Sequence, residues 1–293
     1  MIEFGLMTFA DMAPDAPGQP GLNAHQRMQD LLEEIRLADQ LELDVFGIGE
    51  HHRADYAVSS PAVVLGAAAV ITKKVKLTSA VTVLSSDDPV RVFQDFSTID
   101  LLSDGRAEIM AGRGSFIESF PLFGYSLDDY ESLFTEKLEL LLAVNEKEVV
   151  TWSGEHRASL KGLGVYPRPL QPKIPVWIAA GGTPASAVRA AKLGLPLILA
   201  IIGGQPSHFV TFINLYKETW IKSGRDASQI RFAINNHFFA GTDSNRAADD
   251  FYPHYAAMMN RVGKSRGWPP LSRQHFDLAR SPGGALMVGS VQQ

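Results

Sequence analysis

Short apolar runs rich in β-branched residues alternate along this chain with longer segments whose apolar residues recur every three or four positions. This alternation predicts repeated βα units arranged around a parallel sheet. The expected strands are Glu3–Met7, Val45–Ile48, Val75–Leu84, Ala107–Ala111, Val176–Ala180, Leu197–Ile202 and Phe232–Ala240.

The helical segments carry recognisable start signals. One begins near Asn23 and is followed by apolar residues on a single face. Asp88-Pro89 supplies an N-cap and a first-turn proline, and Thr183-Pro184 opens another helix in the same way. Aromatic and Met stripes on these helices indicate packing against a sheet, so we assign them no cofactor role.

Two stretches interrupt the alternation. Val149–Pro175 is rich in Gly and Pro, and Gly263–Gly284 contains Pro269-Pro270. Both predict excursions from a barrel, the first of them a hairpin around Trp152 and Tyr166.

Composition narrows the class of protein. The 293 residues, 45% hydrophobic and 20% charged, suffice for one large closed domain, and we expect a single domain over residues 1–293. The net charge of -5 with scattered Lys and Arg argues against a nucleic-acid partner. The absence of Cys excludes disulfides and thiolate metal sites, and it suits a reducing cytoplasm.

Neither a leader nor a membrane span is expected from the sequence. The first residues lack a basic region, and the longest apolar stretch, Pro61–Ile71, is too short to cross a bilayer. We therefore expect a soluble cytoplasmic protein.

Candidate chemistry follows the strands, because reacting groups in a parallel barrel lie at the carboxyl ends of strands. Glu50-His51-His52 follows the second strand, where an imidazole can move a proton and a carboxylate can orient it. A solvated histidine pair is an equally open interpretation. Zinc is disfavoured, because adjacent residues point in different directions and no second ligand motif occurs.

Two further strand ends could bind an anion. Arg113 is flanked by Gly112 and Gly114 after the fourth strand, and arginine grips anions with a fork of donors. Ala180-Gly181-Gly182-Thr183, continuing to Ser186, joins a strand to a helix start, which suits a phosphate, although a plain capped turn explains it as well. Together they suggest one phosphate clamp.

Other nucleotide and nucleophile motifs are missing. The arginine loop is not a GxGxxG fingerprint, because Ile117 takes the place of its third glycine. Neither a GxxxxGK[ST] phosphate loop nor a GxSxG elbow occurs. Phosphoryl transfer and serine-dependent hydrolysis are therefore disfavoured.

At this point the sequence resembles the luciferase-like flavin monooxygenases, which share a TIM-barrel fold and include bacterial luciferase and alkanesulfonate monooxygenase. The similarity runs from Phe4 to about Ser290. It is carried by Asp44-Val45-Phe46, Glu50-His51-His52, Pro89-Val90-Arg91, Asp100-Leu101-Leu102-Ser103-Asp104-Gly105-Arg106, Gly112-Arg113-Gly114 and Gly194-Leu195-Pro196. The implied fold class is α/β, a TIM (β/α)8-type barrel with insertions.

The resemblance implies roles for particular residues. His51 would lie near the reactive edge of a flavin, with Glu50 and His52 beside it as further catalytic residues. Ala80-Val81 matches the position of a non-prolyl cis peptide under the flavin ring. The implied FMN-binding residues are Ala80, Val81, Arg113, Ser115, Ala180, Gly181, Gly182, Thr183 and Ser186, and no metal is expected.

Three departures from the family pattern stand out. Glu131 occupies the place of a second phosphate-binding arginine, and Gly112 that of a reactive cysteine. Relatives also continue past Val288-Gly289-Ser290 into an eighth strand, whereas this sequence stops at Gln293. We therefore expect a barrel lacking its last βα unit, either defective or completed by a partner.

The implied function is a monooxygenase that uses reduced FMN and O2 on a small organic substrate, with a separate flavin reductase supplying the cofactor. The resemblance also implies a homodimer. Two alternatives stay open: a deazaflavin-dependent dehydrogenase or reductase on the same fold, and a non-catalytic flavin-binding protein. The substrate has no decodable motif.

Overall fold

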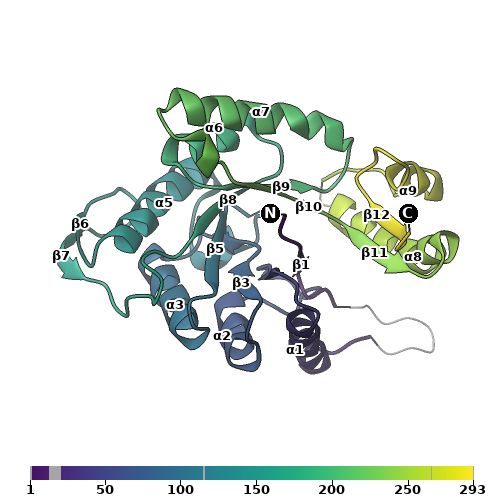
Figure 1. Ribbon diagram of the computed structural model, residues 1–293, viewed down its shortest axis with the longest axis horizontal. Helices are drawn as coiled ribbons and strands as arrows, with labels where there is room; N and C mark the ends of the chain where they lie inside the picture. Colours follow the sequence, from purple (N-terminus) through teal and green to yellow (C-terminus); the bar gives the residue numbers. More distant parts are fainter. Residues whose placement is uncertain (1, 13–20, 115, 265, 293) are drawn as a thin grey trace. The chain divides into compact units, whose positions relative to one another are not determined.

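The structure, a computed structural model, describes residues 2–12, 21–114, 116–264 and 266–292. The chain folds as two compact units, Met1–Trp177 and Ile178–Gln293. Their helices and strands are shown in Figure 1. Each unit is described in turn.

The first unit contains the βα repeats that the hydrophobic pattern predicts. Its elements are β1 (Gly5–Thr8), α1 (Ala24–Gln40), β2 (Val45–Ile48), α2 (Pro61–Ile71), β3 (Lys76–Ser79), β4 (Thr82–Val83), α3 (Pro89–Leu102), β5 (Ala107–Gly112), α4 (Ser119–Phe123), η1 (Leu127–Asp129), α5 (Tyr130–Glu146), β6 (Val149–Trp152) and β7 (Leu160–Gly164). Strands β1, β2, β3 and β5 pair in that order, all parallel, and β4 pairs with β5. Helices α1, α2 and α3 lie side by side along them (Figure 1).

Two helix starts in this unit behave as their sequences predict. Asn23 caps α1 by accepting from the backbone N–H of Gln26 at 2.9 Å. Asp88 caps α3, because its Oδ1 accepts from the N–H groups of Val90 and Arg91 at 2.9 and 3.1 Å. Each cap satisfies backbone donors that have no partner inside the helix. The apolar stretch Pro61–Ile71 forms α2, which contacts β3.

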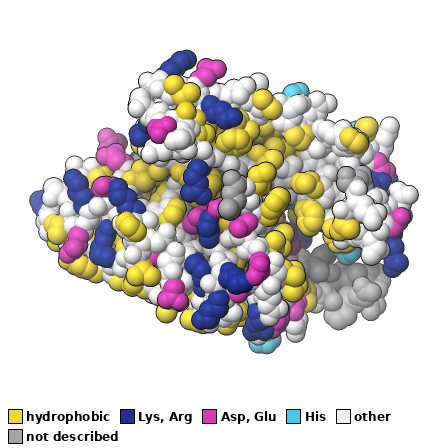
Figure 2. Space-filling view, viewed as in Figure 1, with side chains coloured by type: hydrophobic (Ala, Val, Ile, Leu, Met, Phe, Trp, Pro, Cys, Tyr) yellow, Lys and Arg dark blue, Asp and Glu magenta, His cyan; other side chains and the backbone are white. Residues whose placement is uncertain are grey.

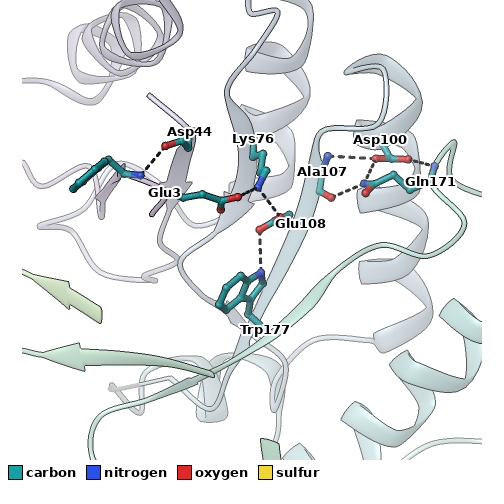
Figure 3. A network of polar contacts seen from close by, with 9 residues as sticks. Glu3, Asp44, Lys76, Asp100, Ala107, Glu108, Gln171 and Trp177 are labelled. Atoms are coloured by element: carbon teal, nitrogen blue, oxygen red, sulfur yellow. Dashed lines mark hydrogen bonds and ion pairs between the residues drawn. The ribbon is translucent and has the colours of Figure 1, made fainter. Parts of the chain in front are cut away.

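A network of charged and polar side chains links strands of the first unit (Figure 3). Lys76 on β3 pairs with Glu3 at 2.7 Å and with buried Glu108 on β5 at 3.8 Å. Glu108 also accepts from the indole N–H of Trp177 at 3.0 Å. The carboxylate is therefore paired and hydrogen-bonded, as burial of a charge requires.

One strand prediction in this unit is wrong. Val75–Leu84 is not a single strand, because the chain forms β3 and β4 with a cis peptide between Ala80 and Val81 in the gap. The predicted excursion after α5 is confirmed as a hairpin, in which β6 and β7 pair antiparallel.

The second unit continues the parallel pattern. Its elements are β8 (Val176–Ala180), whose first two residues belong to the first unit, α6 (Pro184–Leu193), β9 (Leu197–Ile201), α7 (Pro206–Lys222), η2 (Ala227–Gln229), β10 (Phe232–Asn236), β11 (Phe238–Gly241), α8 (Ser244–Lys264), α9 (Arg273–Ala279) and β12 (Met287–Ser290). Strands β8, β9 and β10 pair in order and in parallel.

The predicted strand Phe232–Ala240 is also wrong, because it divides at His237. Strand β10 stays with β9, whereas β11 leaves to pair with β12, a strand that the sequence did not indicate. This second pair packs with α8 and α9 around a small core of its own: Ala248, Tyr255, Phe276, Leu286 and Val288. This small core favours the break at His237, because the departure of β11 allows apolar residues of α8 and α9 to be buried.

Each unit contains one end strand of the parallel strand order, and that strand has a single neighbour. Among the described residues of the first unit β1 pairs only with β2, and in the second β10 pairs only with β9. On the face shown in Figure 2, Lys and Arg side chains are interspersed with Asp and Glu. No helix in the described ranges has the length and apolarity needed to cross a membrane.

Candidate active site

The segment Glu50-His51-His52 leaves the carboxyl end of β2 and is held by backbone hydrogen bonds. The N–H of Gly49 donates to the carbonyl of Thr8 at 2.8 Å, and the N–H of His51 donates to the carbonyl of Val58 at 3.1 Å. The three side chains do not converge. Glu50 and His52 contact each other, whereas His51 lies in different surroundings.

Buried Glu50 and half-buried His52 form a pair. His52 Nε2 lies 2.9 Å from Glu50 Oε1, and Glu50 Oε2 accepts from the N–H of Val83 on β4 at 3.0 Å. The hydrogen bond to Glu50 raises the pKa of His52, against the lowering effect of burial. Glu50 therefore joins β2 to β4 and favours a protonated His52.

The pair lines a cavity of about 390 Å3 in the first unit. Other lining side chains include Thr82, Ser86, Asp87, Arg91, Asp95 and Phe123. Burial, with a smaller contribution from Glu50, raises the pKa of Asp87 to about 6, although the N–H of Asp88 opposes the rise. Burial also raises the pKa of Asp95. None of these cavity acids was singled out from the sequence.

His51 is enclosed by aromatic rings. Its ring centroid lies 4.3 Å from Tyr56, 4.8 Å from Phe9 and 4.8 Å from Phe116. The three rings come from separate loops, and only 6% of His51 is exposed. Aromatic contacts of this length exclude water from most of the imidazole.

The two ring nitrogens of His51 have different environments. Nδ1 lies 3.4 Å from Glu118 Oε1, whereas buried Nε2 has no hydrogen-bond partner among the residues that the structure describes. Burial lowers the pKa of His51, and Glu118, Asp55 and Glu50 oppose the shift only in part. The imidazole is therefore neutral at pH 7, with one nitrogen free to interact with a ligand.

Ala80 and Val81 connect β3 to β4 through the cis peptide that the family resemblance implies. Both side chains are half-buried. Val81 packs so closely on Gly112 that a Cβ there would lie 2.5 Å from Val81 Cγ2. A side chain at position 112 is therefore incompatible with Val81 as it stands.

Arg113 follows β5 and is already engaged. Its guanidinium forms an ion pair with Glu131 on α5 and lies 5.2 Å from the centre of the Tyr130 ring. The Tyr130 hydroxyl donates to the carbonyl of Gly114 at 3.0 Å, which fixes the loop. An anion that approached Arg113 would therefore have to compete with Glu131.

The second unit contains the other candidate anion site. Gly182 has a φ of +97°, a value that favours glycine, and Thr183 precedes α6 without a side-chain capping bond. Ser186 is buried in the first turn, and its N–H donates to the Thr183 carbonyl at 3.0 Å. Ala180 is buried at the end of β8. A helix start of this kind can hold a phosphate.

The structure brings some of the predicted site residues together and leaves others apart. It brings Glu50 and His52 together and places His51 apart from them. Ser115 lies outside the described residues. The single clamp formed by Arg113 and the Thr183 turn stays a prediction, since these groups belong to different units. No cluster of three or more potential metal ligands occurs within the described ranges.

Sequence reasoning missed several neighbours of the site. Phe9, Tyr56, Phe116 and Glu118 surround His51 but come from loops without a helical or strand period. Glu118 directly precedes the short helix α4, and no capping pattern distinguishes it. The only available signal was its position a few residues beyond the end of a strand.

A family model described as luciferase-like monooxygenase matches residues 2–285 of the chain. N-acetyl-S-alkylcysteine monooxygenase from Bacillus subtilis is 29% identical over 276 residues, which cover 93% of this chain and 74% of that protein. The uncharacterised proteins y4vJ and y4wF from Sinorhizobium fredii are 29% and 32% identical, over 58% and 56% of this chain. The chain covers only about half of their length, 49% and 48%.

Solved structures resemble the chain throughout. Monooxygenase RslO1 from Streptomyces bottropensis has a TM-score of 0.83 at 22% identity, covering 99% of this chain and 85% of that one. The oxygenating component of 3,6-diketocamphane monooxygenase from Pseudomonas putida, in complex with FMN, has a TM-score of 0.75 at 18% identity, with the same coverage. An F420-dependent secondary alcohol dehydrogenase scores 0.69 at 21% identity and covers 84% of this chain and 72% of its own. These likenesses confirm a TIM-barrel-like α/β fold.

Proposed function

The chain belongs to the luciferase-like monooxygenase family, and from this premise we propose that it uses reduced FMN and O2 to oxygenate a small organic substrate. The observation that carries the proposal is His51: a buried, neutral imidazole with one nitrogen unpartnered among the described residues. A buried polar atom without a partner is costly, so a bound ligand that supplies the missing hydrogen bond would be favoured.

Each unit by itself contains residues that suit one part of an FMN molecule. Arg113 supplies a guanidinium for the phosphate, and Gly181, Gly182, Thr183 and Ser186 supply a helix start of the kind that binds phosphates. The half-buried Ala80 and Val81 offer a small apolar surface to a flat ring. Ser115 and Ala180 complete the proposed set.

When bound, reduced FMN would supply the electrons that activation of O2 requires. The protein would exclude water and manage protons. Phe9, Tyr56 and Phe116 keep water from His51. Because His51 is neutral, its free nitrogen can accept a hydrogen bond or a proton. The Glu50–His52 pair would hold a second proton at the adjacent cavity.

Anaerobic titration followed by rapid mixing with O2 tests this proposal. Reduced FMN should bind, and its absorbance should return to that of oxidised flavin later than for free FMN. His51→Ala should leave FMN affinity within a few-fold but shorten the delay about tenfold or more, because an acid–base group is lost. His25→Ala, an exposed histidine on α1, is the matched control and should change neither.

Three outcomes would contradict the proposed monooxygenase activity. Reoxidation at the rate of free FMN would indicate a protein that binds flavin without acting on oxygen. Tighter binding of the deazaflavin F420 than of FMN would favour a dehydrogenase, the activity of one structural neighbour. Failure to bind either cofactor would contradict a flavin function altogether. A separate flavin reductase and a second copy of the chain are the partners that we propose with this activity.

A further inference from the structure

A carboxylate lies beside the buried imidazole of His51. Glu118 lies at the start of α4, far along the chain from His51, and its Oε1 is 3.4 Å from His51 Nδ1. The side chain of Glu118 is 22% exposed, and that of His51 is 6% exposed. The contact therefore joins a partly solvated acid to a buried ring.

A neutral imidazole carries its single hydrogen on one nitrogen or the other, and the neighbours of the two nitrogens decide which. A carboxylate accepts hydrogen bonds and cannot donate one when ionised. The nitrogen that faces Glu118 is therefore the one that keeps the hydrogen. The other nitrogen, Nε2, then presents a lone pair, and it is the nitrogen without a partner in the described residues.

We propose that Glu118 is a positioning residue that holds neutral His51 with its hydrogen on Nδ1, so that Nε2 faces the bound ligand as a proton acceptor. The proton-accepting step rests on the proposed function, whereas the choice of tautomer belongs to the protein alone. The sequence separation of the two residues hides the pair from any local motif.

The other groups around His51 do not replace Glu118. Phe9 and Phe116 offer no acceptor atom to a ring nitrogen. Tyr56 packs ring against ring at 4.3 Å, and the Asp55 carboxylate is occupied by Arg53, whose Nε lies 2.9 Å from Asp55 Oδ1. Both Glu50 oxygens have hydrogen-bond partners, His52 and Val83. Asp55 and Glu50 nevertheless raise the pKa of His51 together with Glu118, so all three carboxylates contribute to its charge state.

Nitrogen-15 NMR of the histidine side chains tests the inference on the flavin-free chain at a pH where His51 is neutral. The His51 signals are identified by their loss in His51→Gln. In the wild type Nδ1 should show a bonded hydrogen and Nε2 none. Glu118→Gln, which can both donate and accept, should shift part or all of the hydrogen to Nε2 and lower the pKa of His51 further. Glu118→Asp should keep the wild-type tautomer.

Asp128→Asn, an exposed acid on η1, is the control for loss of one negative charge and should leave both His51 signals in place. Urea unfolding of each variant separates loss of the fold from loss of the tautomer. A wild-type His51 with hydrogen on Nε2, or a Glu118→Gln variant that folds and keeps the wild-type tautomer, would overturn the inference. Because no flavin is present, a failed flavin titration would leave this result intact, and the reverse also holds.

Discussion

Arg113 shows how one neighbour alters the meaning of a binding residue. The guanidinium that would hold a phosphate is paired with Glu131, so an incoming anion must displace a carboxylate. The Glu131 side chain is 60% exposed, and the Arg113 guanidinium also lies 5.2 Å from the centre of the Tyr130 ring. Removal of the Glu131 charge should therefore make Arg113 more available to an anion.

Glu131→Gln is expected to tighten FMN binding by at most about fivefold, which corresponds to the upper end, about 1 kcal/mol, of the free energy of an exposed ion pair. Titration of FMN by fluorescence at low and high salt measures the effect, which should shrink as salt rises. Glu139→Gln, on the same helix and also exposed, should have little effect. Equal gains in the two variants would indicate general charge reduction in place of competition at Arg113.

Single residues were predictable where the signal is local. Asn23 and Asp88 were recognised because a capping residue acts within three positions of itself. Glu118 and the rings around His51 were not, because they approach from loops that are distant in sequence. Gly112 was noted as a missing cysteine, yet the contact with Val81 that excludes a side chain there is visible only in three dimensions.

At the scale of elements, the turn between α3 and β5 joins neighbouring helices. Arg106 donates from Nε to the Ser103 carbonyl at 2.7 Å, and its two other nitrogens donate to the carbonyls of Ala69 in α2 and of Thr72 and Val75 beyond its end. Buried Asp100 accepts from the backbone and side chain of Gln171 at 2.9 and 2.7 Å (Figure 3). The guanidinium thus satisfies carbonyls that α2 leaves unpaired.

Arg106→Lys should lower the free energy of unfolding by about 2–4 kcal/mol, because one ammonium cannot reach all the carbonyls and the unsatisfied ones are partly buried. Urea unfolding measures the change. Arg36→Lys, which alters an exposed arginine paired with Glu33 on α1, should stay within about 0.5 kcal/mol. A loss below about 1 kcal/mol for Arg106→Lys would show that water or Thr72 replaces the lost bonds.

The bounds of strands were predicted well where a short apolar run is clearly delimited in the sequence. Val45–Ile48 and Val176–Ala180 were predicted with their observed bounds, because each is a short apolar run between polar segments. Val75–Leu84 and Phe232–Ala240 were over-extended, because their apolar character continues through a break in the backbone pairing. An apolar run indicates that a segment is buried. It does not show where the backbone changes its hydrogen-bond partner, because the segment stays buried across that change.

For the molecule as a whole, the cavity beside His52 predicts a dependence of stability on pH. The pKa of Asp87 rises from 3.8 to about 6 on folding, chiefly through burial. The folded protein therefore holds a proton that the unfolded chain releases between pH 4 and pH 6. Stability should fall as pH rises through that window and then remain lower, by at most about 3 kcal/mol at 1.36 kcal/mol per pKa unit.

Asp87→Asn should remove this penalty while keeping the acceptor for the N–H of Asp88. Urea unfolding should find the variant more stable than the wild type at pH 8 and similar to it at pH 4. Asp128→Asn, on the exposed η1 turn, should show no such difference between the two pH values. A gain of the same size at both pH values would mean that Asp87 is not protonated in the fold.

The alternation of strands and helices yielded the fold class over the whole chain, because each βα unit is a local pattern repeated. The cavity acids and the enclosure of His51 could not be foreseen, since both depend on which loops meet. The two cavity carboxylates, Asp87 and Asp95, also lack any motif.

The Asp100–Arg106 segment joins the end of α3 to α2 and to Gln171 through the hydrogen bonds of Arg106 and Asp100. The hydrogen-bond partners of Arg106 are thus different residues from the rings that enclose His51. Substitution of those rings would reshape the surroundings of the imidazole while leaving this join between α2 and α3 intact. The neighbourhood of His51 could therefore be redesigned for another guest molecule without weakening the scaffold at this turn.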